Sequence, residues 1–446
     1  PAHERPPARD LGGCPMTPRM WKAPVIALAV LAADSEMDAQ ARAVVIRNAT
    51  LVPVTAPRIE RGTIILRGGR IEALGTNVAV PSDATIVDGT GLFVYPGLID
   101  AGTNLGLTEI GSVPGGEDTR EIGDFNPQNV ILTAVNPHSE LIPVTRVDGV
   151  TTAVTSAEGG LISGAAALID LAGWTPTEMA VVPRVAMVVN FPSAGPQGFG
   201  GFGGGGRQQR SAADRREAMN RQVRQLYQFF EDARAYADVH ARATGLKSDH
   251  KLEALIPFMR GELPVIIDAS SADQIRGAIA FADSLKLKII IRGARDGWRV
   301  ADTLAARKIP VIVGPLTQAP ANDEPYDLVY ANPGVLAGAG VQIAFQSSDA
   351  SNSRTLPYHA ALATAYGLDP DEALRAVTIN PARMFGIADK YGSLEVGKVA
   401  NVFVTTGDPL DVRTHVKHVF IRGDSISFND RHTMLYEKFR ARPKKP

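Results

Sequence analysis

The chain has 446 residues, of which 45% are hydrophobic and 6% aromatic, as in ordinary globular proteins with room for a large domain and a smaller one. Its 46 Lys and Arg residues nearly balance 47 Asp and Glu, and a formal net charge of −1 argues against a nucleic-acid surface or a polybasic membrane patch. The single cysteine, Cys14, excludes a disulfide framework and a cysteine-ligated zinc site. A small molecule is therefore the expected partner.

Residues 1–41 have the pattern of a leader. Two basic residues, Arg19 and Lys22, precede an apolar run over residues 23–33, and Ala39-Gln40-Ala41 suits a signal peptidase. The apolar run is too short to span a bilayer. We predict an exported protein, periplasmic or secreted, that is not held in a membrane after cleavage near Ala41. The alternative is an N-terminal helix that packs on the body of the protein.

Both ends of the remaining chain have the pattern of short strands joined by tight turns. This pattern covers residues 43–95 and returns over residues 393–428, and Gly68-Gly69 between apolar runs is typical of a hairpin. The sequence therefore predicts one small composite β-sandwich domain formed by both ends of the chain. Residues 429–446 are predicted to be a tail with at most a short basic helix.

The middle of the chain, residues 96–392, alternates buried strands with amphipathic helices, which is typical of a parallel sheet with crossover helices. The predicted strands are 98–104, 151–155, 184–190, 263–268, 287–292, 310–314 and 341–346. Residues 166–171 are either an eighth strand or part of an inserted hairpin. The predicted helices are 211–244, 271–285 and 296–308.

Two loops after predicted strands have unusual compositions. Residues 195–210 are glycine-rich and are predicted to be a flexible insertion, with a substrate lid as the alternative. Residues 107–125 carry five acidic side chains, Glu109 among them, which either act at the site or form a solvated face. Both loops follow strands, so both are expected on the face where barrel active sites lie.

Four segments share one family's pattern: Pro96-Gly97-Leu98-Ile99-Asp100-Ala101, residues 263–270, residues 291–298 and residues 341–350. Together with residues 392–398 and 407–410 they resemble the imidazolonepropionase-like branch of the amidohydrolase superfamily. The resemblance implies a TIM-like (β/α)8 barrel over residues 96–392. It also implies a hydrolase that acts on non-peptide carbon–nitrogen bonds, such as those of cyclic amides.

The resemblance also shows which metal ligands are replaced. Gly102 and Asn104 stand where the family has two histidines, and Asp268 and Ser270 stand where it has two more. The family commonly has another histidine at the position of Gly293, whereas Asp349 matches its catalytic aspartate. A standard dinuclear zinc site is therefore not expected.

Three alternatives follow for the site. Asp268, Asp349 and Asn104, supported by Asp100, could hold one hard divalent cation through oxygen atoms. Asp349 and Asp268 could instead act without metal as a general base and acid. In the third alternative the barrel is a non-catalytic pseudoenzyme that binds a ligand or serves as a scaffold. The candidate substrate-binding residues are Asn104, Glu109, Arg292 and Ser270, and a homodimer is the default assembly.

Overall fold

The protein is described from a computed structural model, which covers residues 42–111, 113, 115–194, 211–242, 247–318 and 325–442. The predicted leader and the glycine-rich insertion lie outside these residues. Within the described ranges, no helix is both long and apolar enough to cross a membrane.

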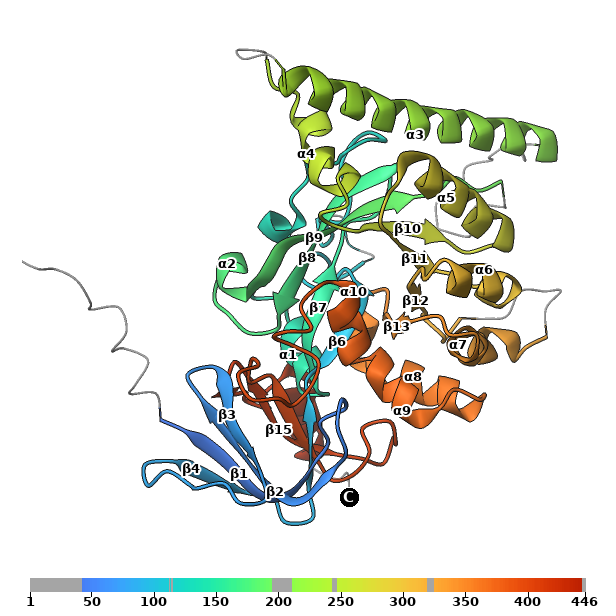
Figure 1. Cartoon of the computed structure of the whole chain (residues 1–446). Helices are drawn as coiled ribbons and strands as arrows, with labels where there is room; N and C mark the ends of the chain where they lie inside the picture. Colours follow the sequence, from blue (N-terminus) through green and yellow to red (C-terminus); the bar gives the residue numbers. More distant parts are fainter. Residues whose placement is uncertain are drawn as a thin grey trace, which may run out of the picture. The chain divides into compact units, whose positions relative to one another are not determined.

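The larger unit is a nearly closed barrel sheet in which the strands follow one another in chain order (Figure 1). Its strands are β6 (Leu98–Thr103), β7 (Val150–Thr155), β8 (Ile162–Asp170), β9 (Ala180–Asn190), β10 (Val265–Ala269), β11 (Ile289–Gly293), β12 (Val311–Val313) and β13 (Ile343–Phe345). The strands are rich in buried Ile, Val and Ala, as expected for a sheet covered on both faces. The first and last strands meet where Ser348 N donates to Gly102 O over 2.9 Å. The predicted barrel is confirmed.

Strand β8 resolves the ambiguity over residues 166–171. It belongs to the barrel sheet, but it pairs antiparallel with both β7 and β9. The linker between β7 and β8 covers only residues 156–161, and a parallel crossover needs about a dozen residues or more. The chain therefore turns back directly, and the sheet is parallel except at this strand.

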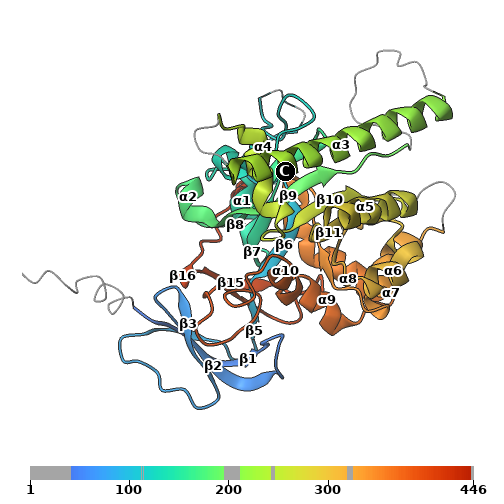
Figure 2. The same ribbon diagram turned by 45° about the horizontal axis from the view of Figure 1, so that its top comes forward.

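The helices pack outside the strands. They are α1 (Leu141–Arg146), α2 (Pro176–Met179), α3 (Ala212–His240), α4 (His250–Met259), α5 (Ala272–Leu285), α6 (Ala301–Ala306), α7 (Leu328–Gly338), α8 (Leu356–Ala365), α9 (Pro370–Ala376), α10 (Ile379–Met384) and α11 (Arg431–Arg440). Helices α5 to α8 lie along the outer side of β10 to β13 (Figures 1 and 2). Helix α3 begins at a capping box in which Ser211 and Asp214 bind each other's backbone N–H groups. The predicted helix over 296–308 is instead a 3-10 turn from Gly297 followed by α6.

The second sheet joins the two ends of the chain, as predicted. It contains β1 (Val44–Leu51), β2 (Ile59–Arg67), β3 (Arg70–Gly75), β4 (Thr85–Asp88), β5 (Phe93–Pro96), β14 (Val402–Thr405), β15 (Val416–Ile421) and β16 (Asp424–Ser425). The two ends meet where β14 pairs antiparallel with β5, with Val404 opposite Val94. Helix α11 follows at the end of the chain, where a short basic helix was predicted.

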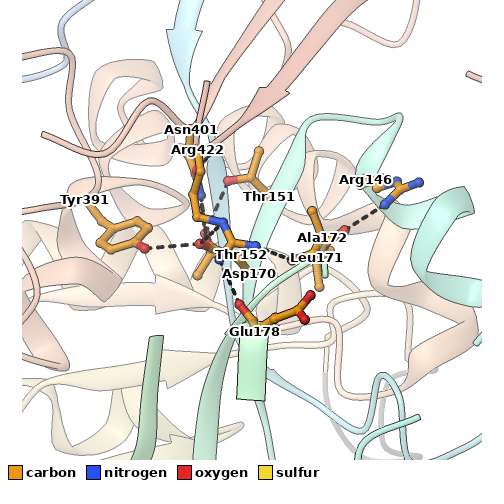
Figure 3. A network of polar contacts seen from close by, with 10 residues as sticks. All are labelled: Arg146, Thr151, Thr152, Asp170, Leu171, Ala172, Glu178, Tyr391, Asn401 and Arg422. Atoms are coloured by element: carbon orange, nitrogen blue, oxygen red, sulfur yellow. Dashed lines mark hydrogen bonds and ion pairs between the residues drawn. The ribbon is translucent and has the colours of Figure 1, made fainter. Parts of the chain in front are cut away.

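A buried polar network connects this sheet to the barrel (Figure 3). Because β8 runs in reverse, its last residue, Asp170, lies at the end of the barrel opposite the carboxyl ends of the parallel strands. Asp170 accepts hydrogen bonds from Thr152 Oγ1 (3.1 Å), Asn401 Nδ2 (2.8 Å) and Tyr391 OH (3.2 Å). Arg422 Nε lies 3.8 Å from the same carboxylate. Burial raises the pKa of Asp170, and we assign this carboxyl a structural role.

Candidate functional site

The carboxyl ends of the barrel strands open into a cavity of about 290 Å³, which we call the barrel mouth. This is the face on which barrel enzymes build their active sites. Most of its lining residues have polar or charged side chains, and the lining comprises Gly102, Thr103, Asn104, Ser156, Glu158, Asp268, Ser270, Arg292, Gly293, Gly314, Pro315, Gln318, Gln346 and Ser348.

An ion pair between neighbouring strands dominates the barrel mouth. Asp268 on β10 is the register partner of Arg292 on β11. Arg292 donates from Nε to Asp268 Oδ1 over 2.5 Å and from Nη2 to Oδ2 over 2.7 Å. Its Nη1 donates to Ser156 Oγ over 2.9 Å, and the Arg292 side chain is only 11% exposed. Three N–H groups of Arg292 are thus fixed by the protein itself.

The electrostatics of this pair keep Arg292 charged. Burial works to lower the pKa of Arg292, but the charge and hydrogen bonds of Asp268, with a contribution from Glu158, outweigh burial and raise it. A bidentate guanidinium–carboxylate pair is also among the most strongly oriented contacts available to side chains. The barrel mouth therefore contains a permanent, immobilised positive charge.

Gln346 occupies the space beside Gly102, where the family resemblance places a histidine. A Cβ atom at position 102 would lie 2.4 Å from Gln346 Oε1. Gln346 is held in place because its Nε2 donates to Gly314 O over 2.8 Å. Glycine at position 102 thus leaves the space that the long side chain of Gln346 fills. Sequence reasoning missed Gln346, although its position directly after a buried strand was a signal.

A second carboxylate in the barrel mouth, Glu158, was also missed. Asn104 Nδ2 donates to Glu158 Oε1 over 3.2 Å, and Asn104 Oδ1 accepts from Ala350 N over 2.7 Å. Arg120 Nη2 lies 3.6 Å from Glu158 Oε2, and the Glu158 side chain is 45% exposed. Its position after β7, in a glycine-rich turn, was the available signal. Glu158 is therefore a solvent-reaching carboxylate within the barrel mouth.

The structure separates the predicted site residues into two groups. Asn104, Asp268, Ser270 and Arg292 line the barrel mouth together. Asp349 is outside this lining, where it caps the 3-10 helix Ala350–Thr355 by accepting from Asn352 N (3.1 Å) and Asn352 Nδ2 (2.6 Å).

Glu109 is likewise outside the lining, where it accepts a hydrogen bond from Asn136 Nδ2 over 3.1 Å. The acidic loop over residues 107–125 therefore does not bring its predicted binding residue, Glu109, to the part of the barrel mouth that the structure describes.

Asp100 lies beneath the barrel mouth and joins the first and last strands. Ser347 Oγ donates to its Oδ2 over 2.5 Å, and the backbone N–H groups of Gly102 and Ser347 each donate to Oδ1 over 3.1 Å. The side chain is fully buried, and burial raises its pKa to about 7 despite these hydrogen bonds. Asp100 thus holds the barrel closed beside Gly102.

The donor set does not fit a divalent cation. Across the described ranges, no three His, Cys, Asp or Glu side chains lie close enough together to hold one. In the predicted set, both oxygens of Asp268 accept from Arg292, both oxygens of Asp349 accept from Asn352, and Asn104 Oδ1 accepts from a backbone N–H. A cation beside Asp268 would also face the charge of Arg292.

Comparison with known proteins identifies the C-terminal part of the chain, because residues 331–426 match the model of the amidohydrolase family. The chain carries an amidohydrolase-family domain. Its fold is that of solved amidohydrolases: an amidohydrolase from Thermotoga maritima MSB8 is 26% identical, with a TM-score of 0.76 over 86% of this chain and 99% of that one.

Two further similarities are weaker or cover less of the chain. The structure of molinate hydrolase has a TM-score of 0.55 at 20% identity, over 91% of this chain and 98% of that one, which concerns the fold alone. The N-substituted formamide deformylase of Arthrobacter pascens is 52% identical over 44 residues, which are 10% of this chain and 8% of the relative. The matched segment thus spans a small part of that relative's length.

Proposed function

We propose that the barrel mouth of this amidohydrolase-fold protein binds a small polar molecule without a metal ion. The observation that carries the proposal is the Asp268–Arg292 pair. It places a fixed guanidinium and its counter-ion where the family resemblance expects metal ligands. The volume of about 290 Å³ lies at the small end of ligand pockets, which suits a small ligand.

The chemistry of the lining supports recognition of a polar ligand. A guanidinium has five N–H donors, and three of those on Arg292 are used by Asp268 and Ser156. The other two can donate to a carbonyl or carboxylate oxygen of a ligand. Glu158, whose carboxylate reaches solvent, can accept from a ligand's N–H groups. Because Asp268 orients Arg292 in advance, binding a ligand costs little side-chain entropy there.

The first experiment is elemental analysis of untagged protein that is purified without chelator and supplied in turn with Zn, Mn, Mg and Ca. We expect substoichiometric metal in every case. The same preparation is screened by thermal shift against small polar molecules, with Glu158→Gln as the test variant and Glu253→Gln, on the outer helix α4, as the matched control. The thermal shift that each bound molecule produces should be smaller in Glu158→Gln and unchanged in Glu253→Gln. Near-stoichiometric metal that is lost in both Asp268→Ala and Asp349→Ala would overturn the proposal.

A second candidate function is hydrolysis of cyclic amide-like carbon–nitrogen bonds by the same barrel. The observation that favours it is a solvent-reaching carboxylate, Glu158, in the mouth of a barrel that is 26% identical to a solved amidohydrolase over most of its length. Turnover of lactams, hydantoins and acylated amino acids by wild type, Asp349→Asn and Glu158→Gln tests it. Loss in Asp349→Asn would support that residue as general base, whereas loss only in Glu158→Gln would transfer the role.

We further propose that the chain belongs to the imidazolonepropionase-like branch, that it is exported with removal of residues 1–41, and that it forms a homodimer. The family resemblance supports the first, and the leader pattern supports the second. N-terminal sequencing of the protein recovered from its native compartment checks export, and light scattering checks the assembly.

A further inference from the structure

We infer that His359, which is outside the lining of the barrel mouth, is a positioning residue for it: His359 fixes the segment over residues 314–318, which forms one wall of the mouth. We call this segment the mouth wall. Gly314, Pro315 and Gln318 line the barrel mouth, and together with Leu316 they also line an adjoining cavity of about 170 Å³. The inference rests on the proposed binding function and names a residue on which that binding depends.

The mouth wall follows β12 and is held by side chains from neighbouring elements. Gln346, after β13, donates from Nε2 to Gly314 O over 2.8 Å. Leu316 N donates to Nδ1 of His359, on α8, over 3.2 Å. Leu316 is only 2% exposed, and a buried backbone N–H that loses its acceptor is costly. His359 thus supplies the acceptor that Leu316 needs in its observed position.

The hydrogen bonds of His359 determine which ring nitrogen carries the proton. A backbone N–H can only donate, so Nδ1 accepts from Leu316 and the proton lies on Nε2. Nε2 lies 3.4 Å from Thr355 Oγ1, and the Thr355 hydroxyl already donates to Asn352 O over 2.7 Å. The Thr355 oxygen therefore accepts from Nε2–H, and both ring nitrogens of His359 are oriented by the protein.

Burial keeps the imidazole neutral, as this arrangement requires. His359 is 1% exposed, and burial lowers its pKa to about 4, against a smaller opposing effect from the charge of Asp349. At neutral pH Nδ1 therefore keeps the lone pair that accepts from Leu316 N. An aliphatic side chain at position 359 could fill the same space but could not accept this hydrogen bond. The imidazole is thus needed as an acceptor and not only for its volume.

The same contacts connect Asp349 with the mouth wall, although Asp349 is outside the lining of the barrel mouth. Asp349 Oδ1 accepts from Asn352 N over 3.1 Å, and Asn352 O accepts from Thr355 Oγ1. Thr355 in turn contacts His359 Nε2, and His359 Nδ1 accepts from Leu316 N. The cap at Asp349 therefore orders the turn against which the imidazole is held.

Hydrogen exchange of the full chain, resolved to the Leu316 amide, tests the inference without a ligand. His359→Asn keeps an acceptor, because asparagine Oδ1 lies the same number of bonds from the backbone as Nδ1, whereas His359→Leu keeps apolar volume and has no acceptor. We expect exchange at Leu316 to be about tenfold faster in His359→Leu and within about twofold of wild type in His359→Asn. The exposed His432→Leu on α11 is the control and should leave it unchanged. Circular dichroism shows whether each variant has folded.

A role in packing alone predicts the opposite order, because leucine fills more of the buried space than asparagine does. Faster exchange at Leu316 in His359→Asn than in His359→Leu would therefore overturn the inference, and so would an unchanged rate in His359→Leu.

Thermal-shift titration with hydantoin, 2-pyrrolidinone and N-acetylglycine measures the consequence for binding. For each probe that wild type binds, we expect the affinity to fall by about fivefold or more in His359→Leu, because a ligand must then order the mouth wall as it binds. In His359→Asn and in the control His432→Leu the affinity should be unchanged.

Failure of this inference is distinguishable from failure of the proposed function. If a probe binds wild type and His359→Leu equally well and loses binding in Glu158→Gln, His359 does not position the mouth, and the binding function stands. If no molecule binds in a manner that depends on Glu158, the proposed function is wrong, and the order of the exchange rates at Leu316 alone decides whether His359 fixes the mouth wall.

Discussion

Gly102 and Gln346 belong to different sequence motifs, but they pack against each other beside Asp100. The Gln346 side chain fills the volume that any Cβ at position 102 would enter, with 2.4 Å between that Cβ and Oε1. A side chain at position 102 would therefore require the Gln346 side chain to move. Gly102 and the amide of Gln346 are therefore coupled by packing at the level of single residues.

This coupling predicts a non-additive double-mutant cycle. Gly102→Ala should destabilise the protein by about 1–3 kcal/mol, because it overpacks the contact with Gln346. Gly102→Ala combined with Gln346→Ala should recover about 1 kcal/mol or more relative to the sum of the single changes. Urea unfolding of the four proteins measures the cycle. The pair Gly102→Ala and Gln228→Ala, which changes an exposed glutamine on the outer helix α3, is the control and should be additive. Additivity in both pairs would contradict the packing argument.

Asp100 gives a prediction about pH. Burial raises the pKa of Asp100 from its ordinary value of 3.8 to about 7 in the folded protein. Between these two pH values the unfolded chain loses this proton and the folded protein keeps it. The contribution of Asp100 to the free energy of unfolding is therefore fully present below about pH 4 and is lost as the pH rises towards 7. A difference of about 3 pH units corresponds to about 4 kcal/mol.

Asp100→Asn mimics the neutral acid and should remove this part of the pH dependence. Free energies of unfolding from urea titrations at pH 4, 5, 6, 7 and 8 provide the measurement. The exposed Asp273→Asn on α5 is the control and should retain the wild-type slope. An unchanged slope in Asp100→Asn would mean that the carboxyl ionises in the folded protein as it does in the unfolded chain.

At the level of elements, the sequence was most informative where a strand is defined by local pattern. The seven predicted barrel strands are buried runs rich in β-branched residues, and each is found within a few residues of its predicted bounds. The direction of β8 was not predicted, because direction depends on pairing and on the short 156–161 linker rather than on composition. Its reversal has a structural consequence, since it brings Asp170 to the C-terminal segment of the second sheet (Figure 3).

The candidate site was less predictable than the fold for the same reason. Asp268 and Arg292 were both singled out, but their pairing depends on the register of β10 against β11. Glu158 approaches Asn104 only because the loops after β6 and β7 meet above the sheet. The family motif directed attention to Asp349, whereas its cap on the following 3-10 helix depends on local backbone geometry that the motif does not specify.

At the level of the whole molecule, one hydrophobic cluster spans the barrel and part of the second sheet, which also has a separate cluster of its own. The two sheets are linked in this way because the chain leaves the second sheet, builds the barrel and returns to the sheet. Phe403 on the returning strand β14 is fully buried, packs against Tyr95 with 5.6 Å between ring centroids, and belongs to the same hydrophobic cluster as the barrel strands. A Cβ on Gly149, just before β7, would lie 2.7 Å from the Phe403 ring, which shows how closely the barrel backbone approaches it. Destabilising this contact should therefore affect both sheets.

Phe403→Ala should lower the free energy of unfolding by about 3–5 kcal/mol, because it removes a fully buried aromatic ring. Its exposed counterpart Phe439→Ala on α11 should change it by less than about 0.5 kcal/mol. Hydrogen exchange at low urea should show faster exchange in peptides from β1–β3 and from β10–β13 together, since one cooperative unit opens as a whole. Faster exchange confined to β1–β3 and β14–β15, with β10–β13 unchanged, would instead mean that the composite sheet unfolds independently and that the barrel retains its mouth without it.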